Sequence, residues 1–129
     1  MTLKKDTTER PLETLGCKNA TGSDIPAKRF VTGTEDSITL TAADTDPILG
    51  VTRSVIKAGQ YGPVMLRGKA VVTAGVGGTT AAVRVKPEAA TGKAIIWGTG
   101  KSEGGIARDT VSADVDVEVE LSGPGITAQ

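Results

Sequence analysis

One stretch near the end of the chain decides the fold: Asp114-Val115-Asp116-Val117-Glu118-Val119-Glu120-Leu121. Apolar and acidic residues alternate strictly in this stretch, and successive side chains of a β-strand point to opposite faces. The alternation therefore predicts a strand that buries three valines and a leucine and turns four carboxylates to the outside. Such a row of like charges also discourages edge-to-edge aggregation of strands.

Other short strands are predicted upstream of this stretch. The segment 37–42 alternates in the same way and places Ile38, Leu40 and Ala42 on one face. Further apolar runs follow about every 8–14 residues and are separated by turn residues such as Asp46-Pro47 and Gly62-Pro63. Because no amphipathic helix interrupts this series, we predict an all-β fold, a small compact β-barrel or sandwich with an extended N-terminal arm.

The first 24 residues differ from the rest in composition. They are rich in charge and poor in apolar residues, and Pro11, Gly16 and Gly22 interrupt any regular element. We therefore divide the chain into an N-terminal arm over residues 1–24 and a β-barrel domain over residues 25–129. A frayed terminus and a short helix over Leu12–Leu15 are the alternatives for this segment.

Size and charge limit the possible partners. The 129 residues suffice for one domain, and 15 basic and 15 acidic residues give a formal net charge of zero. Without a basic excess we expect no direct contact with nucleic acid, and no apolar run reaches the length of a membrane span. Near-zero charge suits a protein that joins an assembly, and the absence of a signal peptide predicts synthesis in a cytoplasm.

Few residues are available for catalysis or for metal binding. The chain has no histidine and a single cysteine, Cys17, which removes the commonest general base and the commonest zinc ligands. We therefore expect no enzyme activity, no cofactor and no metal. The three aromatic residues are Phe30, Tyr61 and Trp97, and we expect Tyr61 and Trp97 to fill the interior.

Two sequence features come close to known binding motifs. Gly98-Thr99-Gly100-Lys101-Ser102 resembles the end of a phosphate-binding loop, but the loop's first glycine is replaced by Ile95. The acidic residues 114–120 suggest a calcium site, yet carboxylates two apart on a strand lie roughly 7 Å from one another. We interpret these features as a glycine-rich hairpin loop and a solvated outer face.

The order of several segments resembles the capsid decoration, or cement, proteins of tailed bacteriophages. Ile25–Val31 has the "I-x-A-x-R-x-V" form found at the opening of that family, and an "I-x-G-V" element follows at Ile48–Val51. Gly59–Val72 then leads into a "G-x-A-x-V" hairpin, and Val83–Ala94 matches a later segment of the family. The resemblance covers about residues 25–123 and rests on the order and spacing of these motifs.

The resemblance implies a small β-barrel protein on the outer surface of a phage head, made in the cytoplasm of the bacterial host. There it would bind the major capsid protein and stabilise the joints between its subunits against internal DNA pressure. The family also suggests a homo-oligomer, with a trimer expected before a dimer. The arm lies outside the resemblance, and we expect it to supply the capsid contacts. Its leucines would dock in grooves and its basic residues would pair with carboxylates: Leu3, Lys4, Lys5, Arg10, Leu12 and Leu15. The alternative is that the arm adds a strand to a capsid sheet edge.

The alternative function is a free-standing β-barrel binding module for a small ligand or a carbohydrate. The low aromatic content speaks against stacking on sugar rings, which normally uses tryptophan and tyrosine faces.

Overall fold

The computed structural model describes residues 10–43, 46–98 and 103–121, and this part of the chain contains strands and no helix. The predicted all-β fold is thus confirmed. The nine strands are β1 Arg10–Lys18, β2 Phe30–Thr34, β3 Ser37–Leu40, β4 Gly50–Thr52, β5 Tyr61–Thr73, β6 Arg84–Pro87, β7 Ala94–Ile96, β8 Gly105–Ala107 and β9 Asp116–Leu121. They form one sheet in which all strand pairs are antiparallel.

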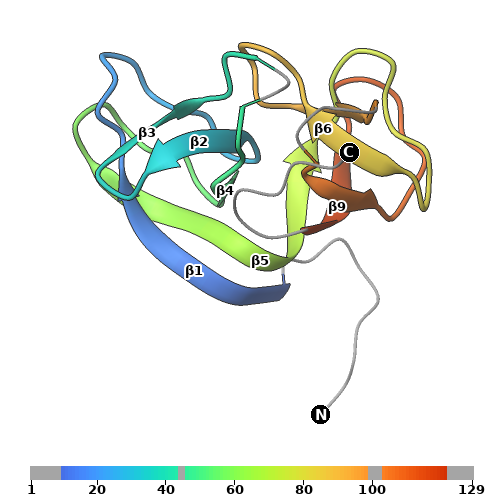
Figure 1. Cartoon of the computed structure of the whole chain (residues 1–129), viewed down its shortest axis with the longest axis horizontal. Coiled ribbons are helices and arrows are strands. Elements are labelled where there is room, and N and C mark those ends of the chain that lie inside the picture. Colours follow the sequence, from blue (N-terminus) through green and yellow to red (C-terminus); the bar gives the residue numbers. More distant parts are fainter. Residues whose placement is uncertain (1–9, 44–45, 99–102, 122–129) are drawn as a thin grey trace.

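Strand β5 is the longest element, with 13 residues, and connects the two halves of the sheet (Figure 1). Its neighbour on one edge is β1, which follows it from Tyr61 to Lys69. On the other edge β4 pairs with the first part of β5 and β9 pairs with the last part. The sheet order is β3-β2-β4-β5-β9-β8-β6-β7, with β1 added to β5 outside this path.

Each half of the sheet curls until its ends meet. In the first half a parallel bridge joins Asn19, just after β1, to Ile38 in β3. In the second half a parallel bridge joins Ala74, just after β5, to Ala94 in β7, and the N–H of Gly75 donates to the carbonyl of Ala94 at 2.8 Å. The result is two curled lobes that share β5, as Figure 1 shows.

The buried apolar residues form two clusters, and β5 contributes to both. One cluster lies within the first lobe, and the other fills the second lobe and extends to Phe30 of β2 and Val51 of β4. Val64 and Leu66 pack in the first cluster with Cys17, Ile25, Val31, Ile38 and Ile56. Met65 belongs to the second cluster, and so do Ala70 and Val72 further along the strand. Positions 65 and 70 would face opposite sides of a regular strand, so the strand must shift its faces between them.

An irregularity around Gly68 produces this shift. The pairing with β1 slips between Pro11 and Thr14, and Gly68 has a φ of 111°. Glycine adopts such a conformation readily, whereas a side chain would strain it. A bulge of this kind bends the strand and increases its twist, which allows one strand to serve two lobes.

Phe30 at the start of β2 anchors the second cluster. It is fully buried, and its N–H donates to the carbonyl of Gly92 at 2.7 Å. Gly104 lies directly against the ring. A Cβ at this position would come within 2.4 Å of the Phe30 Cζ atom. The only phenylalanine of the chain therefore fits against a residue that has no side chain.

The region predicted as an arm is partly in the sheet. Residues 10–18 are extended, as expected, but they form β1, and Cys17 and Ile25 are buried in the first cluster. Tyr61 was expected in the interior, and this prediction is wrong: its side chain is 61% exposed. It lies at the start of β5, and its O–H bonds Asp36 Oδ1 at 3.1 Å instead of filling a core.

We predict that Gly68→Ala lowers the free energy of unfolding by about 1–3 kcal/mol, because alanine is strained at a φ of 111°. Denaturant titration followed by circular dichroism measures the change. Gly22→Ala is the matched control: a Cβ there meets open space, so its effect should stay below about 0.5 kcal/mol. Equal stability of the two variants would contradict the role of Gly68.

We also predict that Gly104→Ala and Phe30→Leu are coupled. Gly104→Ala alone should cost about 1–3 kcal/mol, because its Cβ would overlap the Phe30 ring. Leucine at position 30 leaves room for that Cβ, so Gly104→Ala should cost at least about 1 kcal/mol less in this background. A double-mutant cycle of unfolding free energies measures the coupling, and additive effects would show that the ring and Gly104 do not touch.

Candidate interaction surfaces

The acidic residues at and before β9 are paired with basic residues from other parts of the chain. Asp116 accepts from Lys28 Nζ at 2.7 Å and from the Thr73 hydroxyl at 2.9 Å. Lys93 Nζ lies 2.7 Å from Asp114, and Arg108 Nη1 lies 3.0 Å from Glu120. The predicted outer face is therefore a row of ion pairs and not a free acidic patch.

These pairings stabilise the ionised carboxylates. The hydrogen bond from Lys28 lowers the pKa of Asp116, and the hydrogen bond from Lys93 lowers the pKa of Asp114.

Glu118 differs from the other three acidic residues, because its side chain is only 13% exposed and lies 4.0 Å from Lys69 Nζ. Val115 is 44% exposed and precedes β9, so the strand buries Val117 and Val119 but not the first valine of the alternating stretch.

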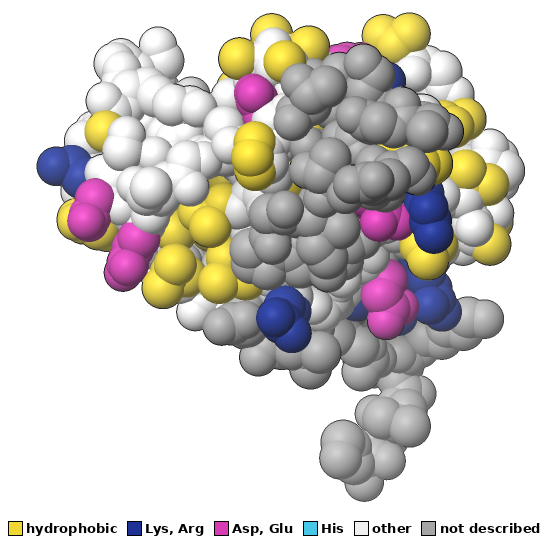
Figure 2. Space-filling model, in the orientation of Figure 1, with side chains coloured by type: hydrophobic (Ala, Val, Ile, Leu, Met, Phe, Trp, Pro, Cys, Tyr) yellow, Lys and Arg dark blue, Asp and Glu magenta, His cyan; other side chains and the backbone are white. Residues whose placement is uncertain are grey.

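A second group of side chains lies on the same lobe and extends from β9 across β8 to β6. The pairing register aligns Arg84 of β6 with Ile106 of β8, and Ile106 with Glu120 of β9. The Arg84 guanidinium lies 5.4 Å from the centroid of the Trp97 ring, and its Nε lies 3.0 Å from Glu103. Ile106 stays 42% exposed between these charged groups. Figure 2 shows apolar side chains among charged ones across the visible face.

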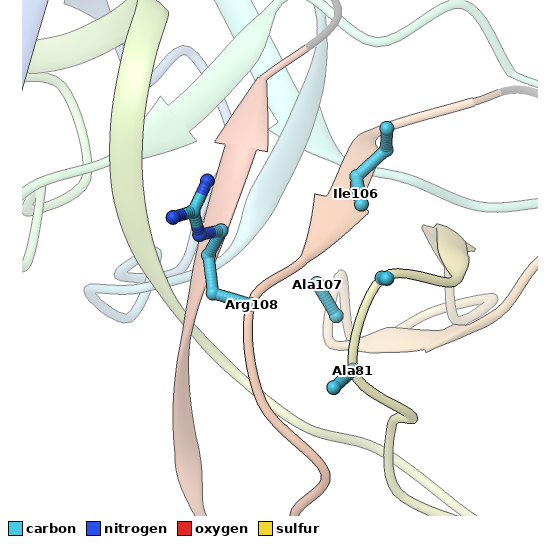
Figure 3. Close-up of a pocket in the computed structure, with 5 residues that line it drawn as sticks. Ala81, Ile106, Ala107 and Arg108 are labelled. Carbon is cyan, nitrogen blue, oxygen red and sulfur yellow. The ribbon is translucent and has the colours of Figure 1, made fainter.

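A shallow pocket of 270 Å³ borders this face (Figure 3). Its lining consists of Ala81, Ala82, Ile106, Ala107 and Arg108. Arg108 turns toward β9, where its guanidinium bonds Glu120, and the other four side chains that line the pocket are aliphatic. No aromatic ring lines it, and it therefore offers no platform for stacking a sugar.

Within the described ranges, no group of three or more histidine, cysteine or acidic residues is placed to hold a metal ion. The same ranges contain no helix that is long and apolar enough to cross a membrane.

The turn after β5 carries a prominent apolar residue. Val76 is 80% exposed, and its N–H donates to Glu88 Oε2 at 2.8 Å. The Thr91 hydroxyl donates to the other oxygen of the same carboxylate. The hydrogen bond from Thr91 is the main reason why the pKa of Glu88 is lowered, and the bond from Val76 adds to it. An ionised Glu88 thus holds the Val76 turn against the 88–91 segment.

The predicted contact residues are distributed along and before β1. Arg10 and Leu12 lie on this strand, whereas Leu3, Lys4 and Lys5 lie outside the described residues. Leu15 is partly buried and packs against the first apolar cluster, so part of its side chain belongs to the interior. The structure therefore places Arg10, Leu12 and Leu15 on one strand, and their contact with a capsid remains a prediction.

Comparison with solved structures gives a structural likeness. The chain is similar to the crystal structure of the N base of head fiber gp8.5 in bacteriophage phi29. The TM-score is 0.66 and the identity is 16%, and the likeness covers 88% of this chain and 97% of the other. No protein-family model and no curated protein matches the sequence. At this identity the likeness establishes the fold.

Sequence reasoning missed the cations that neutralise the acidic row. Lys28 is 88 residues away from Asp116, and Lys93 is 21 residues away from Asp114. No local spacing links such residues, since only the closed sheet brings them together. Arg108 was a closer candidate, because β8 and β9 are consecutive strands and would pair in a hairpin.

We predict that Glu88 contributes to stability in a pH-dependent way. Its pKa is lower in the folded than in the unfolded state, so its contribution is present above about pH 4.5 and is lost as the pH falls. Glu88→Gln should therefore cost on the order of 1 kcal/mol at pH 7 and progressively less as the pH falls below about 4.5. Thermal unfolding at several pH values measures this. A cost that does not depend on pH would contradict the role of the ionised carboxylate.

Proposed function

We propose that this chain is a non-enzymatic structural protein of a phage head, which binds the outer surface of the capsid and strengthens the joints between major capsid protein subunits. The observation that carries the proposal is the likeness to the N base of the phi29 head fiber, which extends over 97% of that chain. The order of motifs between residues 25 and 123 supports the same class from the sequence alone.

The architecture suits a protein that adds contact area. Two lobes share one continuous strand, and each lobe is closed by a bridge between its first and last segments. A body of this kind can contact two neighbouring subunits without opening a hinge between its halves. Its apolar residues at the surface, such as Ile106 and Val76, supply area for burial.

The stabilising effect follows from mass action. A protein that binds only the assembled capsid lowers the free energy of that state by an amount that grows with its concentration relative to the dissociation constant. No catalytic group is needed for this role. In this proposal residues 1–9, with Leu3, Lys4 and Lys5, supply contacts in addition to the folded body.

The position of β1 determines which N-terminal deletion leaves the sheet intact. Deleting residues 1–15 would remove most of β1 and damage the sheet, whereas deleting residues 1–9 leaves β1 complete. We predict that the chain co-sediments with expanded capsids of its own phage, and that deletion of residues 1–9 weakens this binding at least about tenfold. Thermal unfolding of the truncated chain should match that of the full chain.

A matched variant separates charge from length. Lys4→Glu with Lys5→Glu should weaken capsid binding in the same direction if these lysines meet carboxylates. Lys57→Glu, an exposed change in the folded body, should have less effect. Absence of co-sedimentation by the full chain would refute the capsid role, and full binding by the truncated chain would refute only the part played by residues 1–9.

A further inference from the structure

The outer edge of β1 presents backbone groups that no described residue uses. In the register with β5, Gly16 lies opposite Pro63. Pro63 has no N–H, and its carbonyl accepts from the N–H of Arg53 at 3.1 Å on the side of β4. Gly16 and Pro63 thus exchange no hydrogen bonds, so the N–H and C=O of Gly16 point away from β5.

The same orientation recurs two residues away in each direction. The backbone N–H and C=O of Lys18 also point away from β5, and the N–H donates to the carbonyl of Glu35 at 2.8 Å. Thr14 is the corresponding residue on the other side of Gly16 and lies opposite Met65. Both Thr14 and Gly16 are exposed, and their outward backbone groups have no partner among the described residues.

The part of β1 with unused outward backbone groups, Thr14–Cys17, forms an open window with defined ends. At one end the carbonyl of Glu35, in the turn between β2 and β3, occupies the outward N–H of Lys18. At the other end the regular pairing of β1 is interrupted between Pro11 and Thr14. Between these limits the segment Thr14–Cys17 contains neither a charge nor a proline, the two devices that commonly protect edge strands.

We propose that this edge pairs with the same edge of a second copy of the chain, so that two β1 strands form an antiparallel ladder across a twofold axis at Leu15. In this register Thr14 of one copy lies opposite Gly16 of the other, and each pair has outward N–H and C=O groups on both members. The open window is symmetric about Leu15, as an isologous contact requires. The two sheets would become one.

Two further observations favour a second copy as the occupant. The formal net charge of the chain is zero, so two copies approach without overall repulsion. A Cβ at Gly16 would meet no atom within 4 Å, so a side chain can be placed at this position without a clash inside the described part of the chain. In the proposed register Lys18 lies opposite Leu12 of the other copy, so the regular ladder ends on both sides where β1 itself becomes irregular. This inference does not depend on the proposed capsid role.

Sedimentation equilibrium of the full chain tests the proposal. We expect a concentration-dependent shift from the 13.1 kDa monomer to a dimer, with measurements up to about 0.5 mM because a short ladder gives a weak interface. Gly16→Pro removes one outward N–H and no bond to β5, and it should raise the dimer dissociation constant at least tenfold. Circular dichroism and thermal unfolding verify that this variant is folded.

A charge variant tests the same edge without proline. Gly16→Lys places two like charges beside the twofold axis and should also weaken the dimer at least tenfold. Gly22→Lys adds the same charge at another exposed glycine with free space around it and should leave the dimer unchanged. A chain that remains monomeric throughout, a trimer, or a dimer insensitive to both Gly16 variants would overturn the proposal. So would Thr14 and Gly16 amides that become protected from hydrogen exchange only on a capsid.

Discussion

The change of faces along β5 is the constraint on which the rest of the structure depends. Val64 and Leu66 pack in one lobe, and Ala70 and Val72 pack in the other, within 13 residues of a single strand. A regular strand would turn Ala70 and Val72 away from the cluster that contains Met65. The conformation of Gly68 corrects the alternation once, and both lobes can then close, each by its own bridge.

The sequence predicts the parts of this fold that depend on alternation alone. Residues 37–40 and 116–121 form strands, and Ile38, Val117 and Val119 of the predicted faces are buried, because their side chains repeat with the period of a strand. Ala42 and Val115, predicted on the same faces, lie outside these strands and are exposed. It does not predict which of 17 glycines reverses the faces of β5, since a positive φ leaves no mark in the residue pattern. Residues 1–24 read as an arm because their apolar residues are few and Pro11, Gly16 and Gly22 interrupt them, yet residues 10–18 form β1, since pairing with β5 requires mainly backbone groups.

The same distinction applies to the candidate surfaces. The outer face of β9 could be predicted as acidic, but not as neutralised, because its cations lie on other strands and turns. The ion pairs change how this face interacts with other molecules. A free row of four carboxylates would attract cations and basic partners over a distance, whereas paired carboxylates act only at contact. The paired face of β9 therefore exerts little attraction on charged molecules over a distance.

The edge of β1 follows from a residue on the neighbouring strand. Pro63 cannot donate a hydrogen bond, and its carbonyl is occupied by Arg53, so the groups of Gly16 must point outward whatever the side chains of β1 are. A surface made of backbone groups needs no particular residues at its own positions and leaves no motif in its own segment. Its position becomes visible only when the register of β1 and β5 is known, which explains why reading the sequence of residues 10–18 alone could not find it.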